Sequence, residues 1–218
     1  MNRRDFSFHT LHLAAIGLAL PLAARAQGAA IEGREYQKVS PPVPVPAAAG
    51  AARIDVVEFF WYGCPHCNAL QPQLEAWVKR LPADVAFRAV PVGFAPMHEY
   101  HQKLFYALEA MGQLGAMHDK VFAAIHVSQK RLDKDADVAA FMSANGIDGA
   151  KFVETMKSFS VSGKARQAKQ LSEAYHIDGV PTLGIQGRYI TSASMAGSAV
   201  RAFAVAEQLI GQVRKTRA

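Results

Sequence analysis

Cysteine is scarce in this chain, because Cys64 and Cys67 are the only two among 218 residues. Two cysteines so close together cannot cross-link distant parts of the chain, so a fold held together by several disulfides is excluded. The Cys-x-x-Cys spacing does place both sulfurs within one helical turn, where they can form a local disulfide and be reduced again. The pair therefore predicts a redox site, and an inert local disulfide is the alternative.

Other absences narrow the classes of function. Beyond the N-terminal region, no hydrophobic segment suggests integration into a membrane. No basic stripe is interleaved with aromatic residues, so a nucleic-acid partner is not predicted, and there are no internal repeats. The histidines of the central region lack a His-Glu-x-x-His spacing, so no metal site is predicted. We expect these residues on solvated helix faces: His98, His101, His118 and His126.

The N-terminus has the pattern of an export signal. Arg3 and Arg4 precede a moderately apolar stretch over residues 11–24, and Ala24-Arg25-Ala26 has the small-x-small form of a signal-peptidase site. The stretch is shorter than the ~20 apolar residues that a spanning helix needs. We predict that residues 1–26 are removed on export to an oxidising compartment, by a general or a twin-arginine route. A retained amphipathic helix is the alternative.

The first half of the remaining chain predicts a strand, a helix and a second strand. Residues 34–39 suit a short edge strand, and the Pro- and Ala-rich residues 41–52 suit a connector, which together make a first segment of 27–53. The β-branched and aromatic run 54–61 is typical of a strand buried in a parallel sheet. A helix over 68–80 and a strand over 85–92 follow. Pro65 is tolerated in the first turn of a helix, so the cysteines should open this helix.

Residues 97–175 have helical periodicity throughout. Breaks near 112–115, 128–134 and 145–146 predict about four helices there. Two short strands around Gln186-Gly187 and a helix over 199–214 follow. This order predicts an α/β sandwich built from segments 54–96 and 176–218, with residues 97–175 as an inserted all-helical subdomain.

The position of the cysteines predicts different roles for them. A thiolate at a helix N-terminus faces unpaired N–H groups and the positive end of the helix dipole, and both stabilise it. Cys64 is nearest that end and is the candidate nucleophile, whereas Cys67 lies one turn in and is the candidate resolving thiol. His66 lies between them and can donate a hydrogen bond or positive charge to Cys64. A solvated imidazole without a role is the alternative for His66.

Three motifs together resemble one family. Glu58-Phe59-Phe60, then Cys64-Pro65-His66-Cys67, then Gly179-Val180-Pro181-Thr182 are similar to motifs of the DsbA family of periplasmic thiol oxidases. The resemblance covers essentially the whole chain after the export signal, including residues 32–36. It implies a thioredoxin-like fold, a periplasmic location and a strongly oxidising disulfide between the two cysteines.

The resemblance also implies a substrate-binding loop. The Val180–Pro181 peptide bond would be cis and lie against the cysteines, which leaves the backbone of Val180 free to pair with an extended peptide. Thr182 would contribute to the same surface, and a purely structural hydroxyl is the alternative.

Glu58 interrupts an apolar strand, where a charged carboxylate is costly unless it is paired or protonated. The resemblance implies a buried acid beneath Cys67 that relays protons during exchange, and a half-exposed Glu58 is the alternative. The chain departs from the family on the neighbouring strand, where a lysine is common. Here the only cation of that strand is Arg88, and its side chain can lie on the face of the sheet away from Glu58. Ala89 stands near the expected lysine position.

These observations predict an exported thiol:disulfide oxidoreductase that introduces disulfide bonds into reduced exported polypeptides. No cofactor is expected, and the resemblance implies a monomer that is reoxidised by a quinone-linked membrane protein of the DsbB type. An isomerase or reductant of the same fold is an alternative, although the chain before Ile54 is too short for the dimerisation domain of such isomerases. A Cys/His metal-binding or copper-delivery protein is another, but it leaves Pro65 and Val180-Pro181 unexplained.

Overall fold

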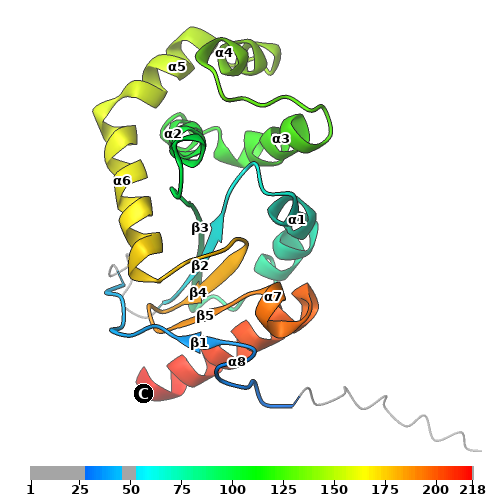
Figure 1. The fold of residues 1–218 in the computed structure, drawn as a ribbon, viewed down its shortest axis with the longest axis vertical. Helices are drawn as coiled ribbons and strands as arrows, with labels where there is room; N and C mark the ends of the chain where they lie inside the picture. The colour runs from blue at the N-terminus through cyan, green and yellow to red at the C-terminus, as the bar shows by residue number, and fades with distance from the viewer. Residues whose placement is uncertain (1–27, 46–52, 218) are drawn as a thin grey trace, which may run out of the picture.

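The computed structural model describes residues 28–45 and 53–217, and the predicted export signal lies outside these ranges. The described residues form a five-stranded sheet of order β1-β5-β4-β2-β3 and eight helices (Figure 1). The strands are β1 Gln37–Lys38, β2 Ile54–Phe60, β3 Val85–Pro91, β4 Thr182–Ile185 and β5 Tyr189–Thr191. The helices are α1 Pro65–Val78, α2 Pro96–Ala110, α3 Leu114–His126, α4 Asp135–Ala144, α5 Gly149–Lys157, α6 Phe159–Ala174, α7 Ala193–Ala196 and α8 Ala199–Arg217. None of the helices in these ranges is long and apolar enough to cross a membrane.

The sheet is centred on β2, as the composition of this strand predicts. All seven of its residues are buried, and it pairs parallel with β3 and antiparallel with β4. Val57 and Phe59 pack in one core with side chains of α2 to α6, whereas Ile54 and Val56 pack in a second core with α1 and α8. Each such side chain contributes about 1.5–3 kcal/mol when it is fully buried, so both faces hold the strand in place.

The N-terminal strand is shorter than predicted. The expected strand over 34–39 is reduced to Gln37 and Lys38, which pair with β5. Just before it, Gly33 has a φ of +78°, and its N–H donates a 2.8 Å hydrogen bond to the Tyr36 carbonyl. This tight turn takes up the residues before Gln37, so only two residues remain extended.

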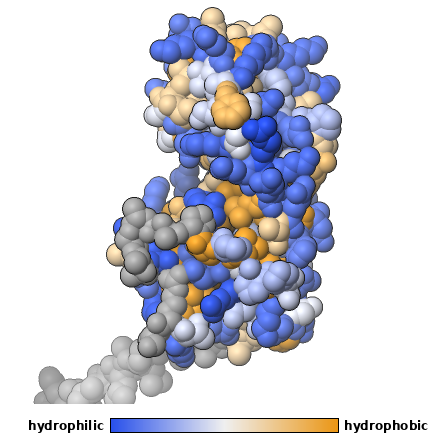
Figure 2. Space-filling view, turned by 90° about the vertical axis from the view of Figure 1, so that its left-hand side faces the viewer, coloured by the Kyte–Doolittle hydropathy of each residue, from blue (hydrophilic) through white to orange (hydrophobic). Residues whose placement is uncertain are grey.

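Five helices, α2 to α6, follow β3 and form a lobe above the sheet (Figure 1). We predicted about four, because the break between α5 and α6 contains neither glycine nor proline. Ser158 is extended there, and its hydroxyl accepts a 3.3 Å hydrogen bond from the Val161 N–H. This cap satisfies a donor that the first turn of α6 would leave unpaired, so it starts a new helix. On the face shown in Figure 2, apolar side chains gather where the lobe meets the sheet.

The histidines of this lobe do not lie on solvated faces, so that expectation was wrong. His101 is only 2% exposed, and His98, His118 and His126 are half-buried. Their rings contact aromatic side chains, and the ring centroids of His118 and Phe60 lie 5.3 Å apart. A neutral imidazole has flat faces that pack edge to face with aromatic rings, which residue spacing alone does not reveal.

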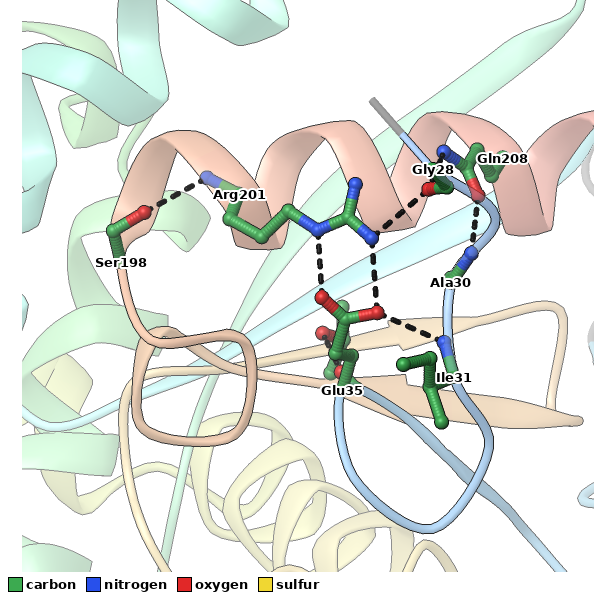
Figure 3. A network of polar contacts seen from close by, with 8 residues as sticks. Gly28, Ala30, Ile31, Glu35, Ser198, Arg201 and Gln208 are labelled. Carbon is green, nitrogen blue, oxygen red and sulfur yellow. Dashed lines mark hydrogen bonds and ion pairs between the residues drawn. The ribbon is translucent and has the colours of Figure 1, made fainter. Parts of the chain in front are cut away.

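The first described residues are held on α8 by polar contacts (Figure 3). Arg201 donates from Nε to Glu35 Oε1 at 2.7 Å and from Nη2 to Glu35 Oε2 at 2.9 Å, which makes a bidentate ion pair. Gln208 Oε1 accepts a hydrogen bond from the Ala30 N–H at 2.7 Å. Both side chains come from α8, so this segment is fixed on the side of the sheet away from the helical lobe (Figure 1).

Candidate active site

The two cysteines lie where β2 turns into α1. Cys64 is the N-cap residue of the helix and Pro65 is its first residue, as predicted. The Cys64 N–H donates to the Trp61 carbonyl at 3.0 Å. Gly63 permits this turn, because a Cβ there would lie 2.3 Å from the Trp61 indole. Cys64 is 8% exposed and Cys67 is fully buried. Both are thiols in this structure, so the disulfide between them stays a prediction.

The two thiols differ in acidity. A hydrogen bond from the Cys67 thiol, helped by the backbone N–H groups of Cys67 and His66, lowers the pKa of Cys64 to about 6. The charge of the His66 ring is the smallest of these causes. The pKa of Cys67 is raised far above its ordinary value, because its proton is held in that same hydrogen bond and because the side chain is buried. Near neutral pH, this arrangement favours a Cys64 thiolate beside a Cys67 thiol.

A loop before β4 lies against the first cysteine. The Val180–Pro181 peptide bond is cis, as predicted. The Val180 carbonyl oxygen lies 3.5 Å from Cys64 Sγ, which can donate to it when protonated. The Thr182 hydroxyl donates to the Gly179 carbonyl at 2.8 Å, so it links two residues of the loop. This contact supports the structural alternative for the Thr182 hydroxyl.

A pocket of about 220 Å³ joins this loop to α1. It is lined by His66, Ala69, Leu70, Gln73, Val180, Pro181, Ala193, Ser194 and Ala199. Three of these are predicted site residues. Ala193 and Ser194 of α7 and Ala199 of α8 could not be found from the sequence, because these small residues belong to no motif. They reach the pocket only through the packing of α7 beside α8. The pocket lies beside the first cysteine, since Val180 is on its lining and the Val180 carbonyl oxygen is 3.5 Å from Cys64 Sγ.

Glu58 lies behind the cysteines and is only 1% exposed, so the half-exposed alternative is wrong. Its neighbours on the adjacent strands are Ala89 of β3 and Leu183 of β4. Gln71 Nε2 lies 3.5 Å from its carboxylate oxygen, which is a long hydrogen bond. Burial raises the pKa of Glu58 to about 8. The carboxyl is therefore poised to exchange a proton near neutral pH, and its charge is one cause of the raised pKa of Cys67.

Arg88, the cation that the sequence offers on β3, does not reach Glu58. Its guanidinium donates to both carboxylate oxygens of Asp55, at 3.0 and 3.1 Å. Asp55 and Glu58 are three positions apart on one strand, so their side chains lie on opposite faces of the sheet. The cation position beside Glu58 is therefore taken by the methyl group of Ala89.

The predicted site residues thus form two groups. One surrounds the cysteines and contains Cys64, Pro65, His66, Cys67, Val180 and Pro181; the other is the buried Glu58 behind them. Within residues 28–45 and 53–217, no three His, Cys, Asp or Glu side chains are grouped so that they could hold a metal ion.

Comparisons with known proteins agree with this geometry. A family model described as a DSBA-like thioredoxin domain matches residues 55–209. The chain is 39% identical over 202 residues to the thiol:disulfide interchange protein DsbA of Burkholderia cepacia, covering 93% of this chain and 94% of that protein. It is 40% identical over 182 residues to the protein of the same name from Pseudomonas aeruginosa, covering 84% and 85%.

Solved structures give the same result. The crystal structure of Pseudomonas aeruginosa DsbA superposes with a TM-score of 0.81 at 38% identity, covering 86% of this chain and 96% of that chain. The oxidoreductase DsbA from Xylella fastidiosa superposes with a TM-score of 0.79 at 25% identity. The predicted thioredoxin-like fold and the predicted family are therefore confirmed. The chain belongs to the DSBA-like thioredoxin family and is a thiol:disulfide oxidoreductase, an enzyme of dithiol/disulfide exchange that introduces disulfide bonds.

Proposed function

We propose that this enzyme oxidises newly exported polypeptides in the periplasm, and that Cys64 is the sulfur that their thiolates attack. The observation that carries the proposal is the opposite shift of the two cysteine pKa values, down to about 6 for Cys64 and far up for Cys67. A stabilised Cys64 thiolate stabilises the reduced enzyme, which makes the disulfide form an oxidant. It also makes Cys64 a good leaving group when the substrate disulfide closes.

The exchange takes place in two steps. A substrate thiolate attacks Cys64 Sγ, which forms a substrate–Cys64 disulfide and breaks the Cys64–Cys67 bond. The electron pair of that bond goes to Cys67, which then takes up a proton. A second substrate thiolate attacks the substrate sulfur of the mixed disulfide and expels Cys64 as a thiolate. The substrate has then lost two electrons and the enzyme dithiol has gained them.

Glu58 is the group that we propose as the proton source for Cys67. It is buried beneath the helix that carries Cys67, and its pKa of about 8 keeps it protonated in neutral solution. Cys67, with its raised pKa, takes the proton as soon as it is released. In the reverse direction, during reoxidation, the Glu58 carboxylate can accept the same proton.

The substrate peptide would lie extended along the loop that contains Val180 and Pro181. The Val180 carbonyl already faces Cys64, so a peptide strand paired with this backbone would bring its cysteine to the reactive sulfur. The pocket beside His66 would hold the flanking side chains, and its small residues, Ala193 and Ser194, leave room for varied ones. This suits an enzyme that acts on many unfolded chains.

The surroundings of the enzyme follow from the same proposal. Export by the predicted signal at residues 1–26 would place the protein in the periplasm, where newly formed disulfides persist. Each cycle leaves a dithiol that must be oxidised again. A quinone-linked membrane protein of the DsbB type would accept the two electrons, and the enzyme would work as a monomer.

Alkylation tests the assignment of Cys64. The reduced protein is treated with iodoacetamide at pH 6, where Cys64 should react at least about a hundredfold faster than Cys67, because only the thiolate is nucleophilic. Cys64→Ser should abolish exchange with a reduced peptide, whereas Cys67→Ser should accumulate a mixed disulfide. Equal alkylation of both thiols would contradict the assignment.

A redox equilibrium separates the oxidase from a reductant of the same fold. The protein is equilibrated with glutathione buffers and followed by fluorescence of Trp61, whose carbonyl accepts the Cys64 N–H. The oxidase should already be reduced in buffers that leave a thioredoxin-like reductant oxidised. Trp61→Phe identifies the signal, since Trp77 is the other tryptophan of the chain. Oxidation that persists in strongly reducing buffers would favour the reductant.

A further inference from the structure

A second pocket opens on the other side of α1 from the pocket beside His66. It lies between α1 and α3, which are side by side in Figure 1, and the edge strand β3 of the sheet, and has a volume of about 330 Å³. Its walls are mostly apolar: Leu74, Val78, Phe87, Ala89, Phe105 and Leu114. Known ligand sites of small molecules start at about this size, and a dry cavity of roughly half the volume holds a benzene ring. The pocket is therefore large enough for an aromatic ring with a short side chain.

The only buried carboxyl group in the pocket lining is that of Glu58. In the described ranges its one hydrogen-bond partner is Gln71, at 3.5 Å, and no cation is paired with it. Ala89 and Leu183 flank it on the adjacent strands. A buried carboxylate without a cation is costly, so a ligand that brought one would gain a charge-assisted hydrogen bond there.

The mouth of the pocket also favours a cation. Glu75 and Asp119 lie on its lining with Lys79, and the Lys79 ammonium is 3.7 Å from a Glu75 oxygen. The other basic side chain on the lining is His118, whose ring is kept neutral because burial lowers its pKa to about 4. His118 Nδ1 is moreover engaged with the Tyr62 hydroxyl at 2.8 Å. No basic group of the lining therefore occupies the place beside Glu58.

We propose that this pocket binds a small organic ammonium ion, with the ammonium group on the Glu58 carboxylate and an apolar body against the walls of α1, α3 and β3. The ligand class is a primary amine on a short arylalkyl or alkyl stem. The ligand would occupy the carboxyl that we propose as the proton source for Cys67, but binding itself needs no disulfide exchange, so this inference is tested separately from the proposed oxidation of exported polypeptides.

The first test measures binding of 2-phenylethylamine to the purified reduced protein by calorimetry and by NMR shifts of backbone amides. The neutral analogue 2-phenylethanol has nearly the same shape and is the matched ligand. At about pH 8.5, where most of Glu58 is ionised, the amine should bind one to one and about tenfold or more tightly than the alcohol, since only the amine forms a hydrogen bond between two charged groups. The largest NMR shifts should fall on the pocket segment around Leu114 and Gly115. Equal binding of the alcohol, or shifts confined to other surfaces, overturns the proposal.

Two variants locate the ammonium group. Glu58→Gln keeps the shape of the pocket and should lose at least about tenfold in amine affinity while leaving the alcohol unaffected. Ala89→Lys supplies an ammonium from the protein itself and should displace the amine. The double variant Glu75→Gln, Asp119→Asn is the control at the mouth and should change the affinity by less than about threefold. Unchanged amine affinity in a folded Glu58→Gln or Ala89→Lys protein overturns the proposal.

The pH dependence gives a third, independent readout. At pH 6 Glu58 is protonated, so binding of an ammonium ion must release one proton from it. The affinity should therefore rise about tenfold per pH unit from pH 6 to pH 8 and then level off. The other titratable and charged side chains on the pocket lining are Glu75, Lys79, His118 and Asp119, and the buried Tyr62 and Cys67 also interact with the charge of Glu58. Glu58→Gln should remove the rise and the mouth variant should keep it; an affinity that does not change with pH contradicts an ammonium on Glu58.

Discussion

Asp55 and Glu58 are two buried carboxylic acids on one strand, and they have different surroundings. Asp55 is 6% exposed and accepts two hydrogen bonds from Arg88, whereas Glu58 is 1% exposed and has only a long contact with Gln71. The paired acid serves the fold, because its charge is neutralised where it lies. The unpaired acid is available for chemistry, because its raised pKa lets it hold a proton at neutral pH and still release it there. The comparison indicates that burial alone does not mark a functional acid on β2. The acid that serves the chemistry is the one that lacks a cationic partner.

The largest expected effect comes from removing the unpaired acid. Glu58 has a pKa of about 8 in the folded protein and an ordinary pKa of 4.5 in the unfolded chain, so its contribution to stability is full below pH 4.5 and is lost as the pH rises through 8. The free energy of unfolding of the wild type relative to Glu58→Gln should thus fall by about 1.4 kcal/mol per pH unit between pH 5 and pH 8. Urea unfolding of both reduced proteins measures this difference.

The Cys64 thiolate has a lowered pKa and changes stability in the opposite direction, but it is present in both proteins and cancels in the difference. Asp55→Asn is the matched control, since it removes the paired acid and keeps Glu58. Its free energy of unfolding relative to the double variant Asp55→Asn, Glu58→Gln should still show the fall. Ala89→Lys should convert Glu58 into a second paired acid and flatten the trend. If the free energy of unfolding changed with pH in the same way in the wild type and in Glu58→Gln, Glu58 would not be the buried neutral acid that we infer.

The next largest effect is expected from breaking the ion pair between Asp55, near the start of β2, and Arg88. Arg88→Ala leaves the Asp55 carboxylate buried without its two charge-assisted hydrogen bonds, and should lower the free energy of unfolding at pH 7 by about 1.5–3 kcal/mol. Arg214→Ala is the control, because Arg214 makes a similar bidentate pair with Asp84 on the surface. The control should cost much less, because solvent screens an exposed pair. Equal losses in urea unfolding would mean that burial does not distinguish the two pairs.

The parts of the fold and the site that depend on residues close together in the chain could be predicted from the sequence. The apolar run of β2, the cysteines at the helix start and the hairpin after Thr182 are local patterns. Gln186 and Gly187 both have positive φ, 53° and 66°, as a tight hairpin turn needs. Gly187 has a further reason that is not local, since a Cβ there would lie 1.9 Å from the Val43 carbonyl oxygen.

The remaining features depend on contacts between distant segments. Glu58 is buried only because the helical lobe and α1 cover it. The sequence alone therefore could not decide between a buried and a half-exposed Glu58. The pairing of Arg88 with Asp55 depends on which face of β3 the guanidinium takes. The prediction for the histidines of the lobe failed for the same reason. His101 is buried by residues that are far away in the chain, such as Tyr62, and the centroids of these two rings lie 6.2 Å apart.

A smaller effect is expected from the exposed charge beside the cysteines. His66 lowers the pKa of Cys64 first through its backbone N–H and least through the charge of its ring. His66→Ser keeps the N–H, so the reduction potential should fall by less than about 30 mV, or tenfold in the redox equilibrium. Glutathione titrations of both proteins measure it. A fall beyond about 60 mV would assign the ring a larger role than this geometry supports.

The smallest expected effect concerns an ion pair near the surface, which extends the comparison to a third acid. Hydrogen bonds from Arg201 and from the Ile31 N–H lower the pKa of Glu35 to about 2, so its contribution to stability is present above pH 4.5 and is lost as the pH falls through 2. Glu35→Gln should therefore unfold at a slightly lower urea concentration than the wild type at pH 7, and the two should converge near pH 2.

Added salt at pH 7 should also reduce the difference, because it screens partly exposed charges. Glu32→Gln, which breaks the exposed pair of Glu32 and Lys38, is the control and should have less effect still. If the loss for Glu35→Gln matched that for Arg88→Ala, or persisted at pH 2, the N-terminal segment would be held on α8 by something other than this ion pair.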